Sequence, residues 1–246
     1  MKNLRMFQRP LKLFGMLVFL SVMASCQFVD GRTIKGNGDL VSQDYLIDNF
    51  QILDLSGSFH VILSRGDQPS LHIETDENLH DYLRIEVKQG KLSLSTDQSV
   101  ILRPSRMEVH ITYTELSEIN ISGVCKLSAF ETLYADKLRI ELSGAADIDL
   151  DVQARQLYTR ISGAGNIQLT GQADDHQIQL PGASHLRAGE LITETTRISL
   201  SGAGSANVHA TELLDAEISG VGKINYQGEP ANKRIRTSGL GSVSPA

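Results

Sequence analysis

The 246-residue chain contains no tryptophan, and its aromatic residues together make up only 5% of the sequence. A fold with so few large rings is filled mainly by aliphatic side chains, which suits a thin core. Long apolar runs are also scarce, and the run at residues 13–20 is too short to span a bilayer comfortably as a permanent helix. Small and aliphatic residues must therefore build most of the structure.

Basic residues are outnumbered as well. The chain has 23 Lys and Arg against 29 Asp and Glu, a formal net charge of −6. Removal of residues 1–25 would take four basic residues and no acidic one, leaving 19 basic against 29 acidic residues and a net charge of −10. A chain this acidic has no basic stripe for nucleic acid and is repelled by anionic lipid head groups. Nucleic-acid binding is therefore excluded as a function class.

The N-terminus has the pattern of a targeting segment. Four basic residues precede the apolar run, and small residues follow it up to Ala24-Ser25-Cys26. This ending resembles a bacterial lipobox, although Met23 stands where leucine is usual. The resemblance implies that residues 1–25 are a lipoprotein signal peptide, cleaved before Cys26, whose sulfur then carries diacylglycerol. The alternative is an ordinary signal peptide followed by a free cysteine.

From Glu118 onward the chain repeats one short segment seven times, and an earlier copy stands alone near the front. Each copy is centred on a glycine, which follows serine in six of the seven repeats. The glycines are 18 to 21 residues apart, a period that indicates a solenoid in which each repeat forms one coil. The predicted turn glycines, starting with the isolated copy, are Gly57, Gly123, Gly144, Gly163, Gly182, Gly202, Gly220 and Gly239.

Alignment on these glycines gives columns with a period of two. Positions two before, four before and four after the glycine are mostly Ile, Leu or Val, which predicts a strand on each side of the corner with one face inward. The column three after the glycine is polar, from Lys126 to Ser242, and is expected to face water. Small residues at the corner predict a sharp turn with positive φ at the glycine.

These columns predict an all-β fold: a two-sheeted parallel β-solenoid, similar to a right-handed β-helix, with coils of about 19–20 residues. An antiparallel meander or sandwich is the rival interpretation, since it also alternates short strands with glycine. A propeller is disfavoured, because its repeats need about forty residues for four strands.

The chain before the repeats is less regular but keeps the alternation of strands. We expect residues 26–33 to form a tether and residues 34–246 to form one solenoid domain, with regular Ser-Gly coils in residues 118–246. Residues 34–117 are expected to form wider coils or a β cap that covers the solenoid's N-terminal end. The segment Asp76 to Tyr82 is the one stretch expected to form a helical turn.

With these features the chain resembles a known family, the "putative auto-transporter adhesin, head GIN domain" family of Bacteroidetes-type lipoproteins. The resemblance rests on the lipobox and the order of several motifs across about residues 34–242. It implies a two-sheeted β-solenoid without known catalytic residues and with a suggested role in adhesion. The motifs are Gly36-Asn37-Gly38, Ser56-Gly57, Asp76-Glu77-Asn78-Leu79, Gly165-Asn166-Ile167 and Gly222-Lys223-Ile224-Asn225.

Three aspartates, Asp147, Asp149 and Asp151, alternate along one predicted strand and should share its outer face. Such a row could form a weak Ca²⁺ site or the acid cluster of a polysaccharide-cleaving solenoid. Calcium prefers six to eight oxygen ligands, and a strand face supplies few. We therefore predict an ordinary solvated face, with no metal and no cofactor.

Other candidate groups are weak. The repeated Ser-Gly corners do not suggest a catalytic serine, and no Gly-x-Ser-x-Gly elbow is present. Cys125 would be the only thiol if Cys26 is acylated, which leaves no internal disulfide, and its place in a small-residue turn column predicts packing rather than catalysis. The histidines show no metal-binding spacing and are expected to be solvated or satisfied by local hydrogen bonds: His72, His80, His176, His185 and His209 are the clearest cases.

The sequence thus predicts a non-enzymatic lipoprotein of the cell envelope, anchored in the outer membrane at its surface or periplasmic side. We expect a binding or adhesion module that meets a glycan or protein ligand through its strand faces and forms a homo-oligomer. The alternatives are a structural lipoprotein without a soluble ligand and a carbohydrate-active enzyme of the pectin-lyase type. Aromatic or acidic ladders would favour glycans, and the tyrosines to locate are Tyr113, Tyr134, Tyr158 and Tyr226.

Overall fold

The computed structural model describes residues 32–246 of the chain. The predicted signal peptide, Cys26 and most of the predicted tether lie outside these residues. The last two residues of the predicted tether, Arg32 and Thr33, begin the first strand. Residues from Thr33 to Ala246 cluster into one compact unit.

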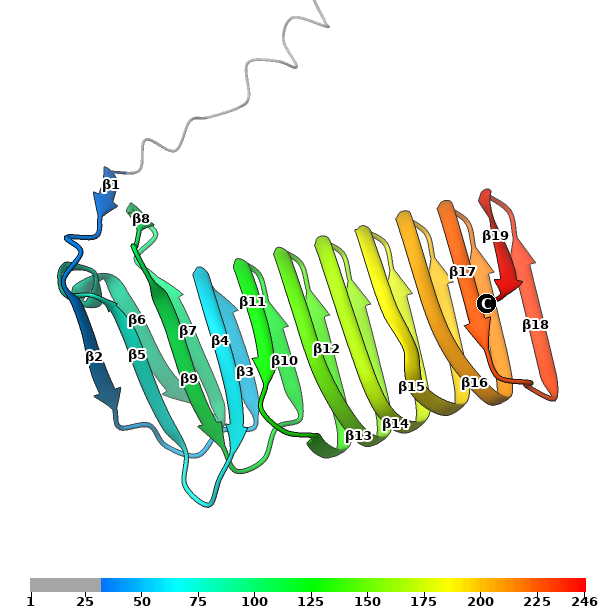
Figure 1. Ribbon diagram of the computed structural model, residues 1–246, viewed down its shortest axis with the longest axis horizontal. Helices are drawn as coiled ribbons and strands as arrows, with labels where there is room; N and C mark the ends of the chain where they lie inside the picture. Colours follow the sequence, from blue (N-terminus) through cyan, green and yellow to red (C-terminus); the bar gives the residue numbers. More distant parts are fainter. Residues whose placement is uncertain (1–31) are drawn as a thin grey trace, which may run out of the picture. The chain divides into compact units, whose positions relative to one another are not determined.

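The unit is almost entirely β-structure, and from β10 onward its strands are stacked in the order of the chain (Figure 1). The N-terminal part consists of β1 (Arg32–Lys35), β2 (Leu40–Tyr45), β3 (Ile52–Ser56), β4 (Ser58–Arg65), β5 (Ser70–Asp76), the 3-10 helix η1 (Glu77–Tyr82), β6 (Leu83–Lys88), β7 (Lys91–Thr96), β8 (Val100–Arg103) and β9 (Met107–Tyr113). The repeats consist of β10 (Glu118–Ile121), β11 (Val124–Ala129), β12 (Leu133–Leu142), β13 (Ala145–Ile161), β14 (Ala164–Leu180), β15 (Ala183–Leu200), β16 (Ala203–Ile218), β17 (Val221–Gln227), β18 (Asn232–Thr237) and β19 (Leu240–Pro245).

Every pairing between consecutive repeats is parallel. The column four residues before the glycine stacks in register, so that Ile119, Ile140, Thr159, Ile178 and Ile198 are successive partners. This arrangement confirms the predicted β-solenoid and rules out a sandwich for the repeats. The Ser-Gly corners form one edge of the coil, and β13 to β16 bend around the other edge, each running from one sheet into the other (Figure 1).

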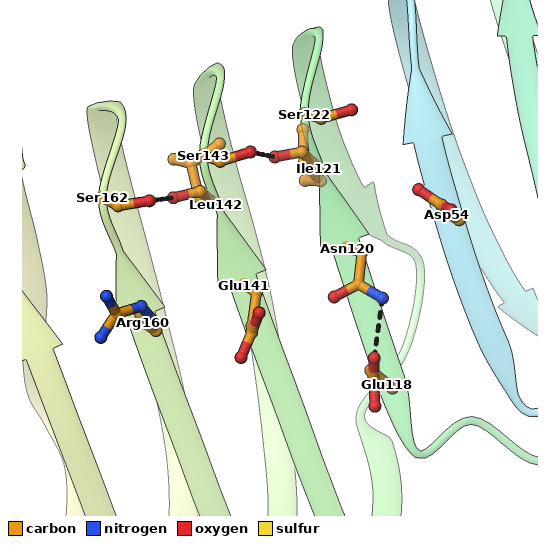
Figure 2. Close-up of a pocket in the computed structure, with 10 residues that line it drawn as sticks. All are labelled: Asp54, Glu118, Asn120, Ile121, Ser122, Glu141, Leu142, Ser143, Arg160 and Ser162. Atoms are coloured by element: carbon orange, nitrogen blue, oxygen red, sulfur yellow. Dashed lines mark hydrogen bonds between the residues drawn. The ribbon is translucent and has the colours of Figure 1, made fainter.

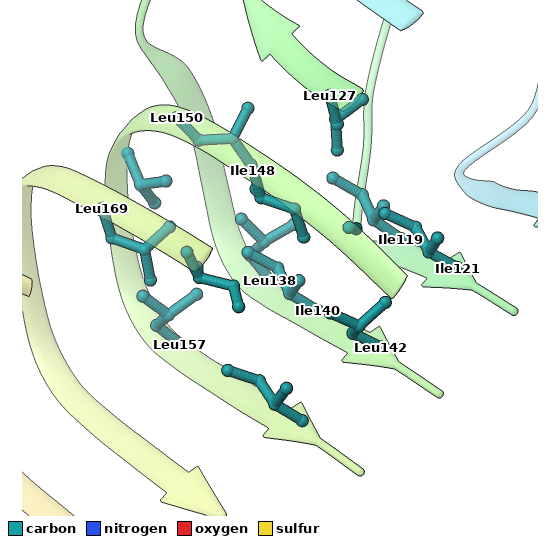
Figure 3. Close-up of a cluster of buried hydrophobic side chains, with 14 of the residues drawn as sticks. Ile119, Ile121, Leu127, Leu138, Ile140, Leu142, Ile148, Leu150, Leu157 and Leu169 are labelled. Carbon is teal, nitrogen blue, oxygen red and sulfur yellow. The ribbon is translucent and has the colours of Figure 1, made fainter. Parts of the chain in front are cut away.

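The interior between the two sheets is filled by stacked aliphatic side chains. In the first coils Ile119, Ile140 and Leu142 from one sheet face Leu127 and Ile148 from the other (Figure 3). All five are at most 2% exposed. Burial of such side chains stabilises the fold by about 1.5–3 kcal/mol each. The core is continuous, because each coil covers the apolar face of the preceding coil.

The corner glycines are required for a different reason from the one predicted. None of the eight has a positive φ; within residues 32–246 that conformation belongs to other residues. The seven glycines from Gly123 to Gly239 instead stack directly on the corner of the preceding coil. A Cβ on Gly163 would overlap the carbonyl oxygen of Gly144 and lie 2.7 Å from the carbonyl carbon and oxygen of Ser143. The prediction of positive φ was wrong, and close backbone approach is the constraint.

The same close approach makes a row of hydrogen bonds along the edge. The carbonyl oxygen of each corner glycine accepts a bond from the amide one residue after the next corner glycine. Val124 donates to Gly57 at 2.7 Å, and Ala164 donates to Gly144 at 3.0 Å. Three corner serines, Ser122, Ser143 and Ser162, add a longer contact to the preceding coil, as from Ser162 Oγ to the Leu142 carbonyl at 3.3 Å.

The N-terminal part, which we call the cap, combines parallel pairings, β3 with β7 and β4 with β9, with antiparallel ones. β5 pairs antiparallel with both β2 and β9, and β6 pairs antiparallel with β7. The strands β3 and β4 then pair in parallel with β10 and β11, where the regular coils begin. The helical turn predicted at Asp76 to Tyr82 is confirmed as η1.

A buried carboxylate fastens the start of the cap. Asp76 is fully buried and accepts bonds from the Gly38 amide at 2.8 Å and from the amide and hydroxyl of Ser105, both at 2.8 Å. Burial by itself raises the pKa of Asp76, but these hydrogen bonds outweigh it and hold the pKa below its usual value. A Cβ on Gly36 would overlap the carboxylate, so the Gly36-Asn37-Gly38 motif fits closely around this residue.

We expect Gly163→Ala to lower the free energy of unfolding by about 1–3 kcal/mol, because its methyl group must push neighbouring backbone apart. Urea denaturation followed by circular dichroism would measure the change. The matched control is Gly189→Ala, whose Cβ would meet only the flexible side chain of Gln227, at 3.1 Å or more. Equal stability of the two variants would contradict the stacking constraint.

Candidate ligand-binding face

The sheet that precedes the corners carries two ladders of outward side chains, which we call the pre-glycine face. One ladder lies three residues before each corner glycine and the other lies five residues before it. The parallel register aligns them across the coils, about 4.8 Å apart. The ladders are Asp54, Asn120, Glu141, Arg160, Gln179, Ser199, Glu217 and Arg236, and Ile52, Glu118, Arg139, Tyr158, Gln177, Arg197, Asp215 and Arg234.

Two adjoining depressions lie on the N-terminal half of this face and share Glu118. The first has a volume of about 320 Å³ and crosses neighbouring coils from Asp54 to Arg160, close to the Ser-Gly corners (Figure 2). The second has a volume of about 390 Å³ and is lined by Arg139, Tyr158 and their neighbours. Both are open to solvent; the first is lined mainly by polar atoms and the second by polar and apolar atoms about equally, so together they form a shallow surface rather than an enclosed pocket.

Two charges in the first depression have no ionic partner among the described side chains. Glu118 accepts a hydrogen bond from the amide of Asn120 at 2.7 Å. Arg160 donates to the side-chain oxygen of Gln179. Figure 2 shows Arg160, Glu141 and Glu118 on three successive coils, with their polar ends projecting from the strands. A carboxylate and a guanidinium held only by amides keep most of their capacity to bind a ligand.

The second depression contains a more rigid group. The Arg139 guanidinium carbon lies 4.1 Å from the ring centroid of Tyr158, within the range of a cation–π contact. Arg139 also donates to Glu141 at 2.6 Å, and the Tyr158 hydroxyl donates to Gln179 at 3.1 Å. These bonds fix the orientation of one aromatic ring and one guanidinium on the face before any ligand binds.

The chemistry of the face suits binding more than catalysis. General acid–base work needs groups of matched pKa that converge on one point. The two largest pKa shifts in the described chain belong to groups inside the core: burial lowers the pKa of His176 to about 3 and raises that of Cys125 to about 12. Cys125 is free, buried and protonated at neutral pH, as predicted for a packing residue.

The aspartate row predicted on one strand face lies on the other sheet. Asp147, Asp149 and Asp151 are exposed on β13. Asn166 donates to Asp147 at 2.9 Å and Thr170 to Asp151 at 2.8 Å. The row is therefore a solvated face with local hydrogen bonds. Among residues 32–246, no group of three or more His, Cys, Asp or Glu is arranged to hold a metal ion.

The predicted histidines are dispersed, and each has a local hydrogen-bond partner. His176 is buried and bonds to Thr159 at 3.0 Å, where a polar pair replaces two aliphatic residues of the core. His80 bonds to the Tyr45 hydroxyl and the Val41 carbonyl, both at 3.0 Å. The other pairs are His72 with Asp44, His185 with Ser205 and His209 with the Gly189 carbonyl.

The four tyrosines do not form a ladder. Tyr113 and Tyr226 are buried, and Tyr134 is exposed by the bend edge at a third depression of about 440 Å³. Only Tyr158 lies on the pre-glycine face. The sequence shows the column of residues three before each glycine. Its mixture of charged and amide side chains did not indicate from the sequence that they form one site.

The fold and this face define a β-solenoid of stacked Ser-Gly coils that presents ladders of polar side chains to solvent. The chain belongs to the family described as "Putative auto-transporter adhesin, head GIN domain", whose sequence model matches residues 49–230. This match confirms the family predicted from the motifs. No curated protein matches the chain.

Solved structures of similar proteins share the fold. A "putative adhesin" from Bacteroides fragilis is 27% identical, has a TM-score of 0.84, and is matched over 87% of this chain and 100% of its own. A "putative lipid binding protein" from Parabacteroides distasonis is 23% identical, has a TM-score of 0.69 and is covered to the same extents. A "putative adhesin" from Parabacteroides merdae is 23% identical, has a TM-score of 0.62 and is matched over 88% of this chain and 100% of its own.

The buried His176 predicts a pH-dependent stability. Its folded pKa of about 3 lies below the ordinary value of 6.5, so the unfolded chain binds a proton that the folded chain does not. Stability from this residue is complete above pH 6.5 and is lost as the pH falls toward 3. Relative to His176→Gln, the wild type should lose about 2 kcal/mol of unfolding free energy between pH 6 and pH 4.5.

Chemical denaturation at several pH values would measure this difference. The matched control is His185→Gln, because His185 is exposed and bonds only to Ser205. Its stability should follow the wild type across the same pH range. Parallel curves for the wild type and His176→Gln would show that the buried imidazole is not held neutral.

Proposed function

We propose that this protein is a non-enzymatic, lipid-anchored module of the cell envelope that binds a surface glycan on its pre-glycine face. The observation that carries the proposal is the pair of charges without ionic partners, Glu118 and Arg160, within ladders of polar side chains. Three carboxylates of the first depression, Asp54, Glu118 and Glu141, provide the acidic groups that hydrogen-bond sugar hydroxyls. The adhesin description of the family supports a binding role.

The repeating geometry supports an extended ligand. Side chains of one ladder recur at about 4.8 Å, so a polymer lying across the coils meets similar donors and acceptors at each step. A single hydrogen bond contributes only about 0.5–1.5 kcal/mol, and more when one partner is charged. Useful affinity on a shallow face therefore requires several contacts, which the two adjoining depressions supply together.

A lipid anchor at Cys26 is part of this proposal. Its support is the run of basic, apolar and small residues that ends at Ala24-Ser25-Cys26. Within residues 32–246 no helix is long and apolar enough to cross a membrane. Several acyl chains, at about 0.8 kcal/mol per buried CH₂, would hold the domain stably at a bilayer.

Glu118→Gln and Arg160→Gln should each weaken binding of a captured glycan about tenfold or more, because hydrogen bonds to charged groups contribute about 1.5–3 kcal/mol. A glycan array would identify the ligand, and calorimetry with that glycan would measure the change. Asp149→Asn and Arg187→Gln are the matched controls, since they remove the same charges from the exposed opposite face. The controls should bind like the wild type.

Two results would overturn the proposed function. Affinity unaffected by either pre-glycine substitution would place the ligand elsewhere. Release of new reducing ends from a polysaccharide, abolished by Glu118→Gln or Asp149→Asn, would show an enzyme instead of a binding module.

Cys26→Ser should release the protein from the membrane fraction while leaving its circular dichroism spectrum unchanged, because only the acylated sulfur is removed. Cell fractionation followed by detergent partitioning would measure this. Cys125→Ala is the control, since this buried thiol has no part in anchoring. Retention of Cys26→Ser in membranes would contradict the anchor, and protease treatment of intact cells would show which side the domain faces.

A further inference from the structure

Two histidines lie directly opposite each other on the outer face of the cap. His72 on β5 and His110 on β9 are register partners in the antiparallel pairing of these strands. Their ring centroids are 6.0 Å apart, with an interplanar angle of 64°. The side chains are 40% and 38% exposed, so both rings can be reached from solvent. They are 38 positions apart in the sequence, and only the strand register brings them together.

A carboxylate holds each ring on one nitrogen. His72 Nδ1 lies 2.8 Å from Asp44 Oδ1, and His110 Nε2 lies 2.8 Å from Glu108 Oε1. Glu108 is itself fixed by Arg106, whose Nη2 lies 3.0 Å from its other oxygen. Carboxylates that bind the distal nitrogen of metal-ligating histidines orient the ring and raise its basicity in the same way.

The second nitrogen of each ring is free to accept a bond. Neither His72 Nε2 nor His110 Nδ1 has a hydrogen-bond partner among the side chains and backbone of residues 32–246. A histidine whose first nitrogen donates its proton to a carboxylate presents a lone pair on the other nitrogen. When each neutral ring donates to its carboxylate, the lone pair for a metal ion lies on His72 Nε2 and on His110 Nδ1.

The separation of the rings also fits one shared ion. With a metal–nitrogen bond of about 2.0–2.1 Å, the metal lies roughly 3.2 Å from the centroid of each coordinating ring. Two rings on one ion then have centroids about 5–6.5 Å apart, depending on the angle at the metal. The observed 6.0 Å falls in this range. A tetrahedral angle at the metal corresponds to centroids about 5.2 Å apart, so the two rings must come slightly closer to share a tetrahedral ion.

We propose that His72 and His110 form a surface site for one zinc-like divalent transition-metal ion, with Asp44 and Glu108 as positioning residues. Imidazole ligands favour Zn²⁺, Ni²⁺ and Cu²⁺ over Ca²⁺ and Mg²⁺, which prefer oxygen. Two protein ligands leave two positions of a tetrahedral ion to water or to a donor from a bound molecule. The site is independent of the pre-glycine face.

Isothermal titration of the purified full-length protein with ZnCl₂ at pH 7.5 tests this site. We expect one ion per chain, and loss of that binding in both His72→Gln and His110→Gln. Asp44→Asn and Glu108→Gln should weaken it by about 10–100-fold, the effect of losing a positioning carboxylate. Calcium titrated under the same conditions should not bind at this site.

Two controls separate the site from other donors. His185→Gln, an exposed histidine in another coil, should bind Zn²⁺ like the wild type. A Cys26→Ser background removes the only cysteine besides Cys125 and should leave the binding unchanged. The histidine variants should keep the wild-type melting curve in chelator, because both side chains are partly exposed.

Electron paramagnetic resonance of the Cu²⁺-loaded protein gives a second readout, with hyperfine coupling to two imidazole nitrogens expected. Zinc affinity that is the same in the wild type, His72→Gln and His110→Gln would overturn the proposal. The proposal would also be overturned if the wild-type spectrum showed coupling to a single nitrogen and this spectrum were unchanged in His72→Gln and His110→Gln.

Discussion

The close stacking of backbone at the Ser-Gly corners is the constraint on which the rest of this structure depends. Each corner lies so near the preceding one that a Cβ on Gly163 would overlap the carbonyl oxygen of Gly144. The same contact lets the Ala164 amide donate to that oxygen at 3.0 Å. Glycine at this position therefore brings each coil within hydrogen-bond distance of the preceding coil along this edge. These bonds align successive coils, and the strands on both sides of the corner pair in the same register.

This constraint separates the columns that must repeat from those that are free to vary. Inward columns keep mostly aliphatic residues, because each coil buries the face of its neighbour, and the polar exceptions include the bonded pairs Thr159 with His176 and Thr193 with Thr196. The side chains of the outward columns are not buried between coils and need not be aliphatic. Ligand-binding groups can accumulate there without cost to the fold, which is why Glu118 and Arg160 can remain without ionic partners on the pre-glycine face.

The cap solves a different physical problem, since the first coil has no neighbour to cover it. Antiparallel strands and η1 close this end, and buried Asp76 fastens the chain that leads into it. Antiparallel pairing also sets side chains from distant segments opposite one another. His72 and His110 become neighbours in this way, with each ring held by a carboxylate. Both candidate sites thus arise from register, one across parallel coils and one across the cap.

The sequence by itself determined the solenoid, the corners at Gly57 to Gly239 and the family, because a period of 18–21 residues with aligned apolar columns has few other solutions. It also showed Cys125 as a packing residue and Asp147 to Asp151 as a solvated row. Only the tertiary structure decided why the corners need glycine, since close approach between coils is invisible in one repeat. It also decided the cap and both candidate sites, because strand register, rather than spacing along the chain, sets which side chains meet.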